Sequence, residues 1–355
     1  MARWDRVACV AVASALLLVA STAALGGGAP PAPAPTLTGP TRGGLNIVLP
    51  YYPATPRAAA MGNATVALAG VDSHNPAALA FATKIDIEFD YGRMNFNHGP
   101  DLDMYHGHIV VPTPGIGGFT KILGMGISTR NDDVSRMGAK THVWGRQFGI
   151  CTGVPIPLPD AVPGKLGFGF AGFPSDPSEL RLSSGGTTLA TGRAQSQIGS
   201  IRLGFLYIPL EQVSIGAEFT HIKDWLRQRA LVPQFGYITT DAHYYVNLWT
   251  FGAAFHPDDK TTIVVQHLTG RAQGPGVRAQ YDAFSVGLER TVPISEEISF
   301  ALRAGIHDSN PTFGLGVGLP RGFRVDYALL SNYGEQLDRA FGHGTLHIIG
   351  VGKSF

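Results

Sequence analysis

Residues 57 to 81, with the sequence RAAAMGNATVALAGVDSHNPAALAF, decide how the rest of the chain is interpreted. Small residues, mainly alanine and glycine, dominate this stretch and predict a compact segment. The segment ends near Asn75-Pro76, where we expect a turn, because a residue that precedes proline is disfavoured in the helical region. From Lys84 onward the pattern changes to that of strands. The sequence therefore predicts a small plug followed by an all-β domain.

Apolar and polar residues alternate in the first predicted strand and again in several later ones. This period of two is typical of a β-strand with one apolar and one polar face. The same alternation recurs at 213–220 and at 300–306. In the first strand the apolar set is Ile85, Ile87, Phe89 and Tyr91, and the acidic set is Asp86, Glu88 and Asp90.

The composition favours one barrel over several soluble domains. Charged residues are 15% of the chain, against about 25% in typical soluble domains, and glycine is unusually frequent, with 46 among 355 residues. Low charge without a long apolar run after the N-terminal region fits a barrel that faces lipid with alternate residues only. The net charge of +1, without any Lys/Arg cluster, gives no indication of nucleic-acid binding.

The N-terminal residues 1–23 have the features of a secretory signal peptide. Arg3 and Arg6 precede an apolar run, and Ser21-Thr22-Ala23 offers small residues for cleavage. An uncleaved membrane anchor is the alternative, although the apolar run is shorter than the roughly 18 residues that a spanning helix needs. Cleavage would leave Cys151 as the only cysteine, so we expect no internal disulfide.

The rest of the chain divides into three parts by composition. Residues 24–53 form a Pro/Gly-rich linker, residues 54–83 the plug, and residues 84–355 the barrel. Tight connections rich in proline, aspartate and glycine predict hairpins at 209–212, 257–260 and 320–322. Longer polar stretches, which we expect to be loops on the opposite side of a membrane, lie at 93–102, 131–142, 175–192 and 268–280.

The number of strands follows from a count of the alternating runs. Counting strand-like runs after the plug gives about 14, an even number as in bacterial outer-membrane barrels. The prolines between residues 142 and 200 obscure the boundaries there, so 12 or 16 strands stay open.

A small-residue stretch that ends in Asn-Pro-Ala and leads directly into an alternating strand resembles the N-terminal hatch and first strand of the FadL-like fatty-acid transporters of bacterial outer membranes. The PorV and PorQ proteins of type IX secretion share this layout. Near the C-terminus, NPTFGLGV from Asn310 and FRVDYALLSN from Phe323 look like the closing strands of PorV-like proteins. The matching plug positions are Ala59, Gly62, Ala64, Ala67, Ala69, Asp72, Asn75, Pro76, Ala77 and Leu79.

This resemblance implies a transmembrane antiparallel β-barrel in the bacterial outer membrane, with the plug in its lumen anchored by Asn75, Pro76 and Ala77. It implies a channel for the uptake of hydrophobic small molecules such as fatty acids or hydrocarbons, with outer-membrane lipid as its surroundings. The alternative that it leaves open is a PorV-like component of a protein secretion or attachment system, whose partner would be an exported protein, or a general porin. We expect no cofactor.

Charged residues on the polar faces of the strands are expected to point into the lumen. There they either hold the plug through hydrogen bonds and ion pairs or line a water-filled interior. The residues assigned to the lumen by this rule are Asp86, Glu88, Asp90, Arg202, Glu218, Glu289, Arg303, Arg324 and Asp326.

Two residue patterns resemble parts of a metal site and of an enzyme active site, but we predict neither kind of site. His106-Gly107-His108 places two imidazoles on one strand face, a spacing that suits a divalent metal, but no third ligand is near in sequence, and we predict no metal. Ser285 or Ser299 with His307 would give a Ser/His pair, yet no Gly-x-Ser-x-Gly turn is present and we predict no enzyme.

The hydrophobic ligand is expected to contact the segment just before the plug. Its candidate residues are Val48, Leu49, Tyr51 and Tyr52, which need an apolar environment if they lie in or under the lumen. The alternative is that they only pack the plug against the wall. Gly314, Gly316 and Gly318 are expected to leave space on one side of the lumen.

Overall fold

The computed structural model describes residues 55–96, 102–113, 118–129, 139–173, 178–184, 187–232, 236–274, 277–331 and 344–355. The strands among these residues form a single sheet in which all pairings are antiparallel. Its strands are β1 (Asp86–Phe96), β2 (Leu102–Thr113), β3 (Gly118–Thr129), β4 (Ala139–Ile156), β5 (Lys165–Phe173), β6 (Ser178–Ser184), β7 (Thr187–Leu210), β8 (Val213–Val232), β9 (Gly236–Asp258), β10 (Thr261–Gly274), β11 (Val277–Pro293), β12 (Ser299–His307), β13 (Asn310–Gly318), β14 (Phe323–Ser331) and β15 (Gly344–Ser354).

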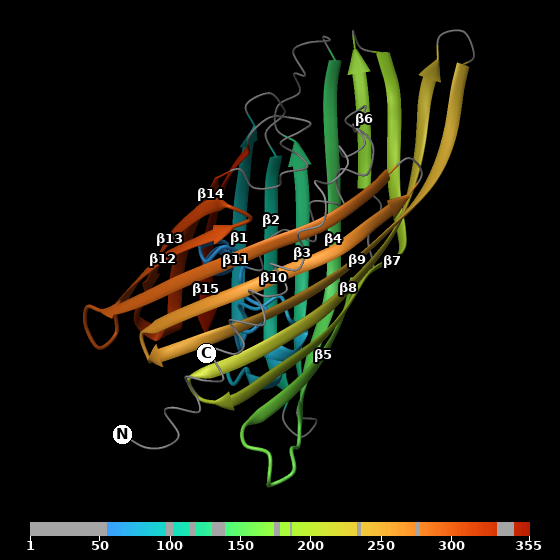
Figure 1. The fold of residues 1–355 in the computed structure, drawn as a ribbon. Helices are drawn as coiled ribbons and strands as arrows, with labels where there is room; N and C mark the ends of the chain where they lie inside the picture. Colours follow the sequence, from blue (N-terminus) through green and yellow to red (C-terminus); the bar gives the residue numbers. More distant parts are fainter. Residues whose placement is uncertain are drawn as a thin grey trace.

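The strand pairings follow one another around a ring (Figure 1). The first strand, β1, pairs with both β2 and the last strand, β15, and the remaining gap is bridged where β3 pairs with β4. The short strands β5 and β6 both lie between β4 and β7, so the 15 strands of the described residues occupy one position fewer, that is 14. The sequence-based prediction of an antiparallel barrel is confirmed. The 14 positions also agree with the predicted number of about 14 strands.

The two faces of the wall differ as the alternation predicts. In β1, Ile87 and Phe89 are 42% and 59% exposed, whereas Asp86 and Glu88 are both 3% exposed. The outward positions of the other strands also carry large apolar side chains, such as Leu302 at 48%. Apolar residues outside and polar residues inside are typical of a barrel that is surrounded by lipid.

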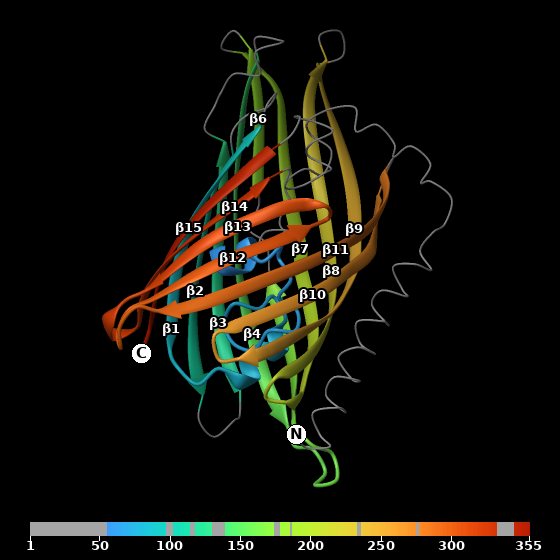
Figure 2. The same ribbon diagram turned by 60° about the vertical axis from the view of Figure 1, so that its left-hand side comes forward.

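The strands differ greatly in length, so one side of the barrel is taller than the other (Figures 1 and 2). Strands β7, β8 and β9 have 24, 20 and 23 residues, whereas β12, β13 and β14 have 9 each. About 9 to 11 residues are enough for a tilted strand to cross a membrane. The long strands therefore exceed the length that one membrane crossing requires.

This extension corrects all four predicted loops in part. Residues 178–184 and 187–192 belong to β6 and β7, and residues 268–274 and 277–280 to β10 and β11. Likewise, residues 93–96 belong to β1 and residues 139–142 to β4. Polar side chains do not end these strands, because the backbone groups stay paired as long as a neighbouring strand continues. The tight hairpins at 209–212, 257–260 and 320–322 are confirmed, the last as the 3-10 turn η3 (Pro320–Gly322).

The plug lies inside the ring and is built from two short helical pieces (Figure 2, blue). The helix α3 (Pro56–Ala60) begins at Thr55, whose hydroxyl accepts a hydrogen bond from the Ala58 amide at 3.1 Å. The 3-10 helix η2 (Pro76–Phe81) begins at Asn75 in the same way. In the described part of the chain, neither these nor any other helix is long and apolar enough to span a membrane.

Candidate functional site

Asn75 joins the plug to the wall of the barrel. Its side-chain carbonyl accepts a hydrogen bond from the Ala77 amide at 3.0 Å and so starts η2. Its side-chain amide donates to the carbonyl of Val66 in the plug and to that of Phe205 in β7, both at 2.8 Å. Because Asn75 is fully buried, each of these bonds replaces contact with water. Asn75 thus fixes both the fold of the plug and its position.

Glycines on the inner wall allow the plug to lie directly on the strands. A Cβ atom on Gly204 would overlap the side-chain carbonyl of Asn75, and one on Gly169 would overlap the backbone at Pro76-Ala77. On the opposite part of the wall, Gly314 lies against Ala60. Two further glycines in the same role are Gly216, against Val66, and Gly287, against Met61. The close contact between plug and wall depends on the missing side chains at these positions.

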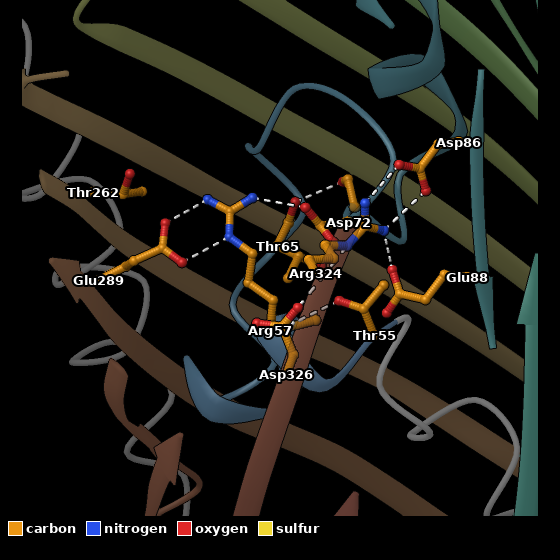
Figure 3. A network of polar contacts seen from close by, with 12 residues as sticks. Thr55, Arg57, Thr65, Asp72, Asp86, Glu88, Thr262, Glu289, Arg324 and Asp326 are labelled. Atoms are coloured by element: carbon orange, nitrogen blue, oxygen red, sulfur yellow. Dashed lines mark hydrogen bonds and ion pairs between the residues drawn. The ribbon is translucent and has the colours of Figure 1, made fainter. Parts of the chain in front are cut away.

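A buried network of ion pairs begins at Arg57 in the plug (Figure 3). The guanidinium of Arg57 donates two hydrogen bonds to Glu289 of β11, at 2.7 and 2.9 Å, and one to Asp72 of the plug at 2.7 Å. Burial alone would raise the pKa of Asp72, but the attraction of Arg57 and Arg324 exceeds this effect and lowers that pKa below its usual value. Both plug charges are thereby neutralised by partners that are close in space.

The network continues along the inner face of the wall. Glu289 also accepts a hydrogen bond from Arg303 of β12, which in turn donates to Asp326 of β14. On the other side, Arg324 of β14 binds Asp86 of β1 through two hydrogen bonds at 2.6 and 2.9 Å. Arg324 also contacts Glu88, and Ser354 donates to Asp86 at 2.6 Å. Charges from four strands and the plug are therefore held together in the lumen.

Neutral polar contacts fix the middle of the plug. The side-chain carbonyl of Gln266 in β10 accepts hydrogen bonds from the amides of Thr65 and Val66, both at 2.9 Å. Ser214 of β8 donates to the carbonyl of Ala67 at 2.6 Å. Thr312 of β13 donates to the carbonyl of Ala60 at 2.8 Å. The backbone groups of the plug, which would otherwise be costly to bury, find partners on the wall.

The structure thus places all of the predicted lumen residues on the inner side of the wall, and it shows what each contacts. Arg202 contacts the plug through His74, at 3.3 Å between Nη1 and Nδ1. Asp90 pairs with His106 at 2.8 Å. Glu218 accepts a hydrogen bond from Thr220 at 2.9 Å. Of these residues, Glu289 and Arg202 form hydrogen bonds with the plug, whereas the others form theirs with residues of the wall.

The pairing of β1 with β2 gives His108 neighbours that the sequence does not show. Asp86 lies 3.1 Å from His108, and donor atoms of Asp86, Glu88 and His108 all lie within 4.8 Å of one another. The two carboxylates near His108 come from the neighbouring strand, and His106 is not part of this cluster but pairs with Asp90. Because the guanidinium of Arg324 already binds both carboxylates, we assign this cluster to the ion-pair network.

Other expectations are corrected or lie outside the described residues. The glycines of β13 leave no open side: Gly314 contacts the plug, Gly316 the side chains of Asp326 and Arg303, and Gly318 the hydroxyl of Ser299. Ser285 does lie 2.9 Å from His307, but both are packed where the plug meets the wall near Gly62. The signal peptide, the linker and the candidate ligand residues Val48, Leu49, Tyr51 and Tyr52 lie outside the described residues.

The inside of the barrel carries an apolar surface that was not predicted from the sequence. Inward-facing side chains of β8, β9 and β10 form a cluster next to the plug, which we call the apolar strip. The apolar strip comprises Ile222, Val246, Leu248, Leu268 and Ala272. The available signal was in β9, where the inward residues Val246 and Leu248 are apolar like the outward residues Tyr245 and Trp249, with Asn247 as the polar exception. A membrane strand that is apolar on both faces has an inner surface unlike that of a water-filled pore.

An antiparallel barrel with a lumen that is filled partly by an N-terminal plug defines the class of this protein. No protein-family model matches the chain. No curated protein sequence matches it either. Among solved structures, the CymD monoaromatic hydrocarbon channel is similar with a TM-score of 0.52 and 12% identity, covering 86% of this chain and 98% of CymD.

Two further solved structures show the same similarity. A FadL homologue from Pseudomonas aeruginosa has a TM-score of 0.52 and 9% identity over 86% of this chain and 98% of its own. A deltaS2S3 mutant of the TodX monoaromatic hydrocarbon channel has a TM-score of 0.50 and 12% identity over 84% of this chain and 97% of its own. At such low identities the similarity establishes the fold, and the FadL-like architecture predicted from the plug motif is confirmed at this level.

Proposed function

We propose that this protein is an outer-membrane channel for the passage of hydrophobic small molecules. The observation that carries the proposal is the apolar strip, because it faces the interior of the barrel beside the plug. A general porin that passes ions and sugars has a polar interior, whereas an apolar inner surface lowers the free energy of an apolar molecule by removing its surface from water.

The position of the apolar strip supports this function. Gly216 and Gly252, which contact Val66 of the plug, lie on the same inner faces of β8 and β9 as Ile222 and Leu248. The apolar strip therefore begins a few residues along the wall from the plug. A molecule that enters from the side of the long strands would meet the apolar strip before it meets the plug.

The similar solved structures support the same reading. CymD and TodX are described as monoaromatic hydrocarbon channels, and the Pseudomonas aeruginosa protein as a FadL homologue. An apolar ligand of that general kind is our proposal for this chain. Location in the bacterial outer membrane, the signal peptide at 1–23 and the linker at 24–53 belong to the same proposal.

The test is a binding assay with the purified, refolded full-length protein in detergent. A fluorescent apolar dye is bound to the barrel and displaced with p-xylene. The double variant Val246→Thr with Leu248→Asn keeps the shape of the two side chains and makes them polar. We expect it to weaken p-xylene binding about tenfold or more, because each change places a polar group in an apolar contact.

Val264→Thr is the matched control. Val264 also faces inward, on the neighbouring strand β10, but it packs against Met61, Ala64 and Val66 of the plug and not in the apolar strip. Its p-xylene affinity should equal that of the wild type. Absence of p-xylene binding in the wild type, together with co-purification of an exported protein, would favour the secretion role over transport. Free permeation of sugars through the wild type would favour a general porin.

A further inference from the structure

The inner wall next to the plug is polar on one side and apolar on the other. The strand register places Glu218 of β8 opposite Thr250 of β9, and Thr250 opposite Leu268 of β10. One level further along, Thr220 lies opposite Leu248. Since these residues share the inner face, a molecule in contact with Leu248 and Leu268 is within a few ångströms of the polar groups at Thr220 and Thr250.

Glu218 has an oxygen atom that the described residues do not satisfy. Its Oε1 atom accepts a hydrogen bond from the Thr220 hydroxyl at 2.9 Å. In the described part of the chain, its Oε2 atom has no hydrogen-bond partner, although the residue is only 6% exposed. A buried carboxylate oxygen without a partner is costly, and natural structures rarely contain one without a reason.

We propose that Glu218 recognises a hydroxyl group on the ligand, so that the preferred ligand is an apolar molecule with one alcohol or phenol group. This inference rests on the proposed function, since it concerns the same inner surface. The hydroxyl would donate to Oε2 of Glu218, and the apolar part would lie on Leu248, Leu268 and the rest of the apolar strip. One end of the ligand is thereby distinguished from the other.

The charges near Glu218 favour a ligand with a hydroxyl group over a pure hydrocarbon and over a fatty-acid carboxylate. A pure hydrocarbon would leave Oε2 unsatisfied and would lose the hydrogen bond. A fatty-acid carboxylate would be repelled by the carboxylate of Glu218. The nearby cation, Arg202, attracts Glu218 electrostatically and contacts His74 of the plug, so its charge is already engaged. A neutral hydrogen-bond donor is the group that fits this environment.

The experiment uses three probes that differ in one substituent: p-cresol, p-xylene and p-toluate. Their affinities are measured by dye displacement for the refolded wild type, Glu218→Leu and Glu218→Gln. We expect Glu218→Leu to lower the affinity for p-cresol relative to p-xylene about tenfold, the order of magnitude of one hydrogen bond to a charged group. Glu218→Gln should retain part of this preference, because its amide oxygen still accepts a hydrogen bond.

Glu211→Gln is the control, since Glu211 lies exposed in the turn that joins β7 and β8. It should leave all three affinities unchanged. Folding of each variant is verified by heat-modifiable gel mobility, and Thr220→Val provides a second test if Glu218→Leu does not fold. Thr220→Val should weaken p-cresol binding more than p-xylene binding, because it removes the hydroxyl that orients Glu218.

The outcomes separate this inference from the proposed function. An equal ratio of p-cresol to p-xylene affinity in wild type and Glu218→Leu would overturn the role of Glu218 and leave the hydrophobic channel intact. Preferential binding of p-toluate would also overturn it. Failure of the wild type to bind any of the three probes would contradict the proposed function itself.

Discussion

Asn75 of the plug and Gly204 of β7 are in direct contact, so that a Cβ atom on Gly204 would overlap the side-chain carbonyl of Asn75. A larger residue at position 204 therefore tests whether the plug lies against β7. We expect Gly204→Ala to displace Asn75 and to lower the free energy of unfolding by about 1 to 3 kcal/mol, the usual cost of overpacking. Ion conductance in planar bilayers should rise as the plug loosens.

The matched control for this prediction is Gly172→Ala in β5. A Cβ atom there would meet only Phe170, at an ordinary distance of 3.6 Å. Stability, measured as the temperature of the heat-modifiable mobility shift, and conductance should both stay at wild-type values. If the two glycine variants behave alike, the plug does not rest on the wall as described.

The ion pair between Arg57 and Glu289 should hold the plug more strongly than an exposed pair would. Arg57→Gln leaves Glu289, whose side chain is 8% exposed, with fewer partners in a buried position. Loss of one partner of a fully buried pair costs about 3 to 5 kcal/mol, and we expect about half of this because Arg57 is 25% exposed and Arg303 remains. Conductance measurements should show more frequent opening.

A comparison pair on the outside of the barrel provides the control for Arg57. Arg290 and Asp258 are each 50% exposed and lie 2.8 Å apart. Arg290→Gln should change the stability by less than about 1 kcal/mol and leave the conductance unchanged. Equal effects of the two substitutions would mean that the buried network does not retain the plug.

Leu302 and Arg303 test which face of β12 meets lipid. Leu302 is 48% exposed on the outer face, whereas the side chain of Arg303 is 7% exposed on the inner face. Near the middle of the membrane, Leu302→Arg should cost about 2 to 4 kcal/mol. Refolding into detergent, followed by gel mobility, measures this cost. Tolerance of Leu302→Arg would show that this face does not contact lipid.

The plug should remain in place under mildly acidic conditions. The pKa of Asp72 lies below its usual value in the folded protein, because Arg57 and Arg324 outweigh the effect of burial. A carboxyl group with a lowered pKa stabilises the fold above its unfolded pKa and loses this contribution only as the pH falls through the folded pKa. Conductance should therefore be the same at pH 7 and pH 5, and Asp72→Asn should raise it at both values.

Local patterns in the sequence were sufficient to predict the wall and the turn at Asn75. The alternation in β1 assigns Asp86 and Ile87 to opposite faces without knowledge of any partner strand, because the side-chain period of a strand is fixed by its geometry. The proline after Asn75 likewise acts on its neighbour alone. Predictions of this kind need no long-range information.

Contacts between distant residues could not be predicted in this way. Glu289 lies 232 residues from Arg57, and only the closure of the sheet brings the two together. The strand β2 could be recognised by itself, but the neighbours of His108 follow from its register with β1. The apolar strip was missed because each of three strands contributes only one or two of its residues.

The position of the plug before all strands of the wall in the sequence has a consequence for biogenesis. Its partners on the wall are added much later: Phe205 lies 130 residues after Asn75, Gln266 lies 201 residues after Thr65, and Thr312 lies 252 residues after Ala60. Bringing such distant residues together is slow, because the loops between them must close first. The plug thus leaves the ribosome before every strand of the wall, yet it is among the last parts to acquire a fixed shape. During insertion into the membrane, the strands must close around a plug that has not yet reached its final conformation.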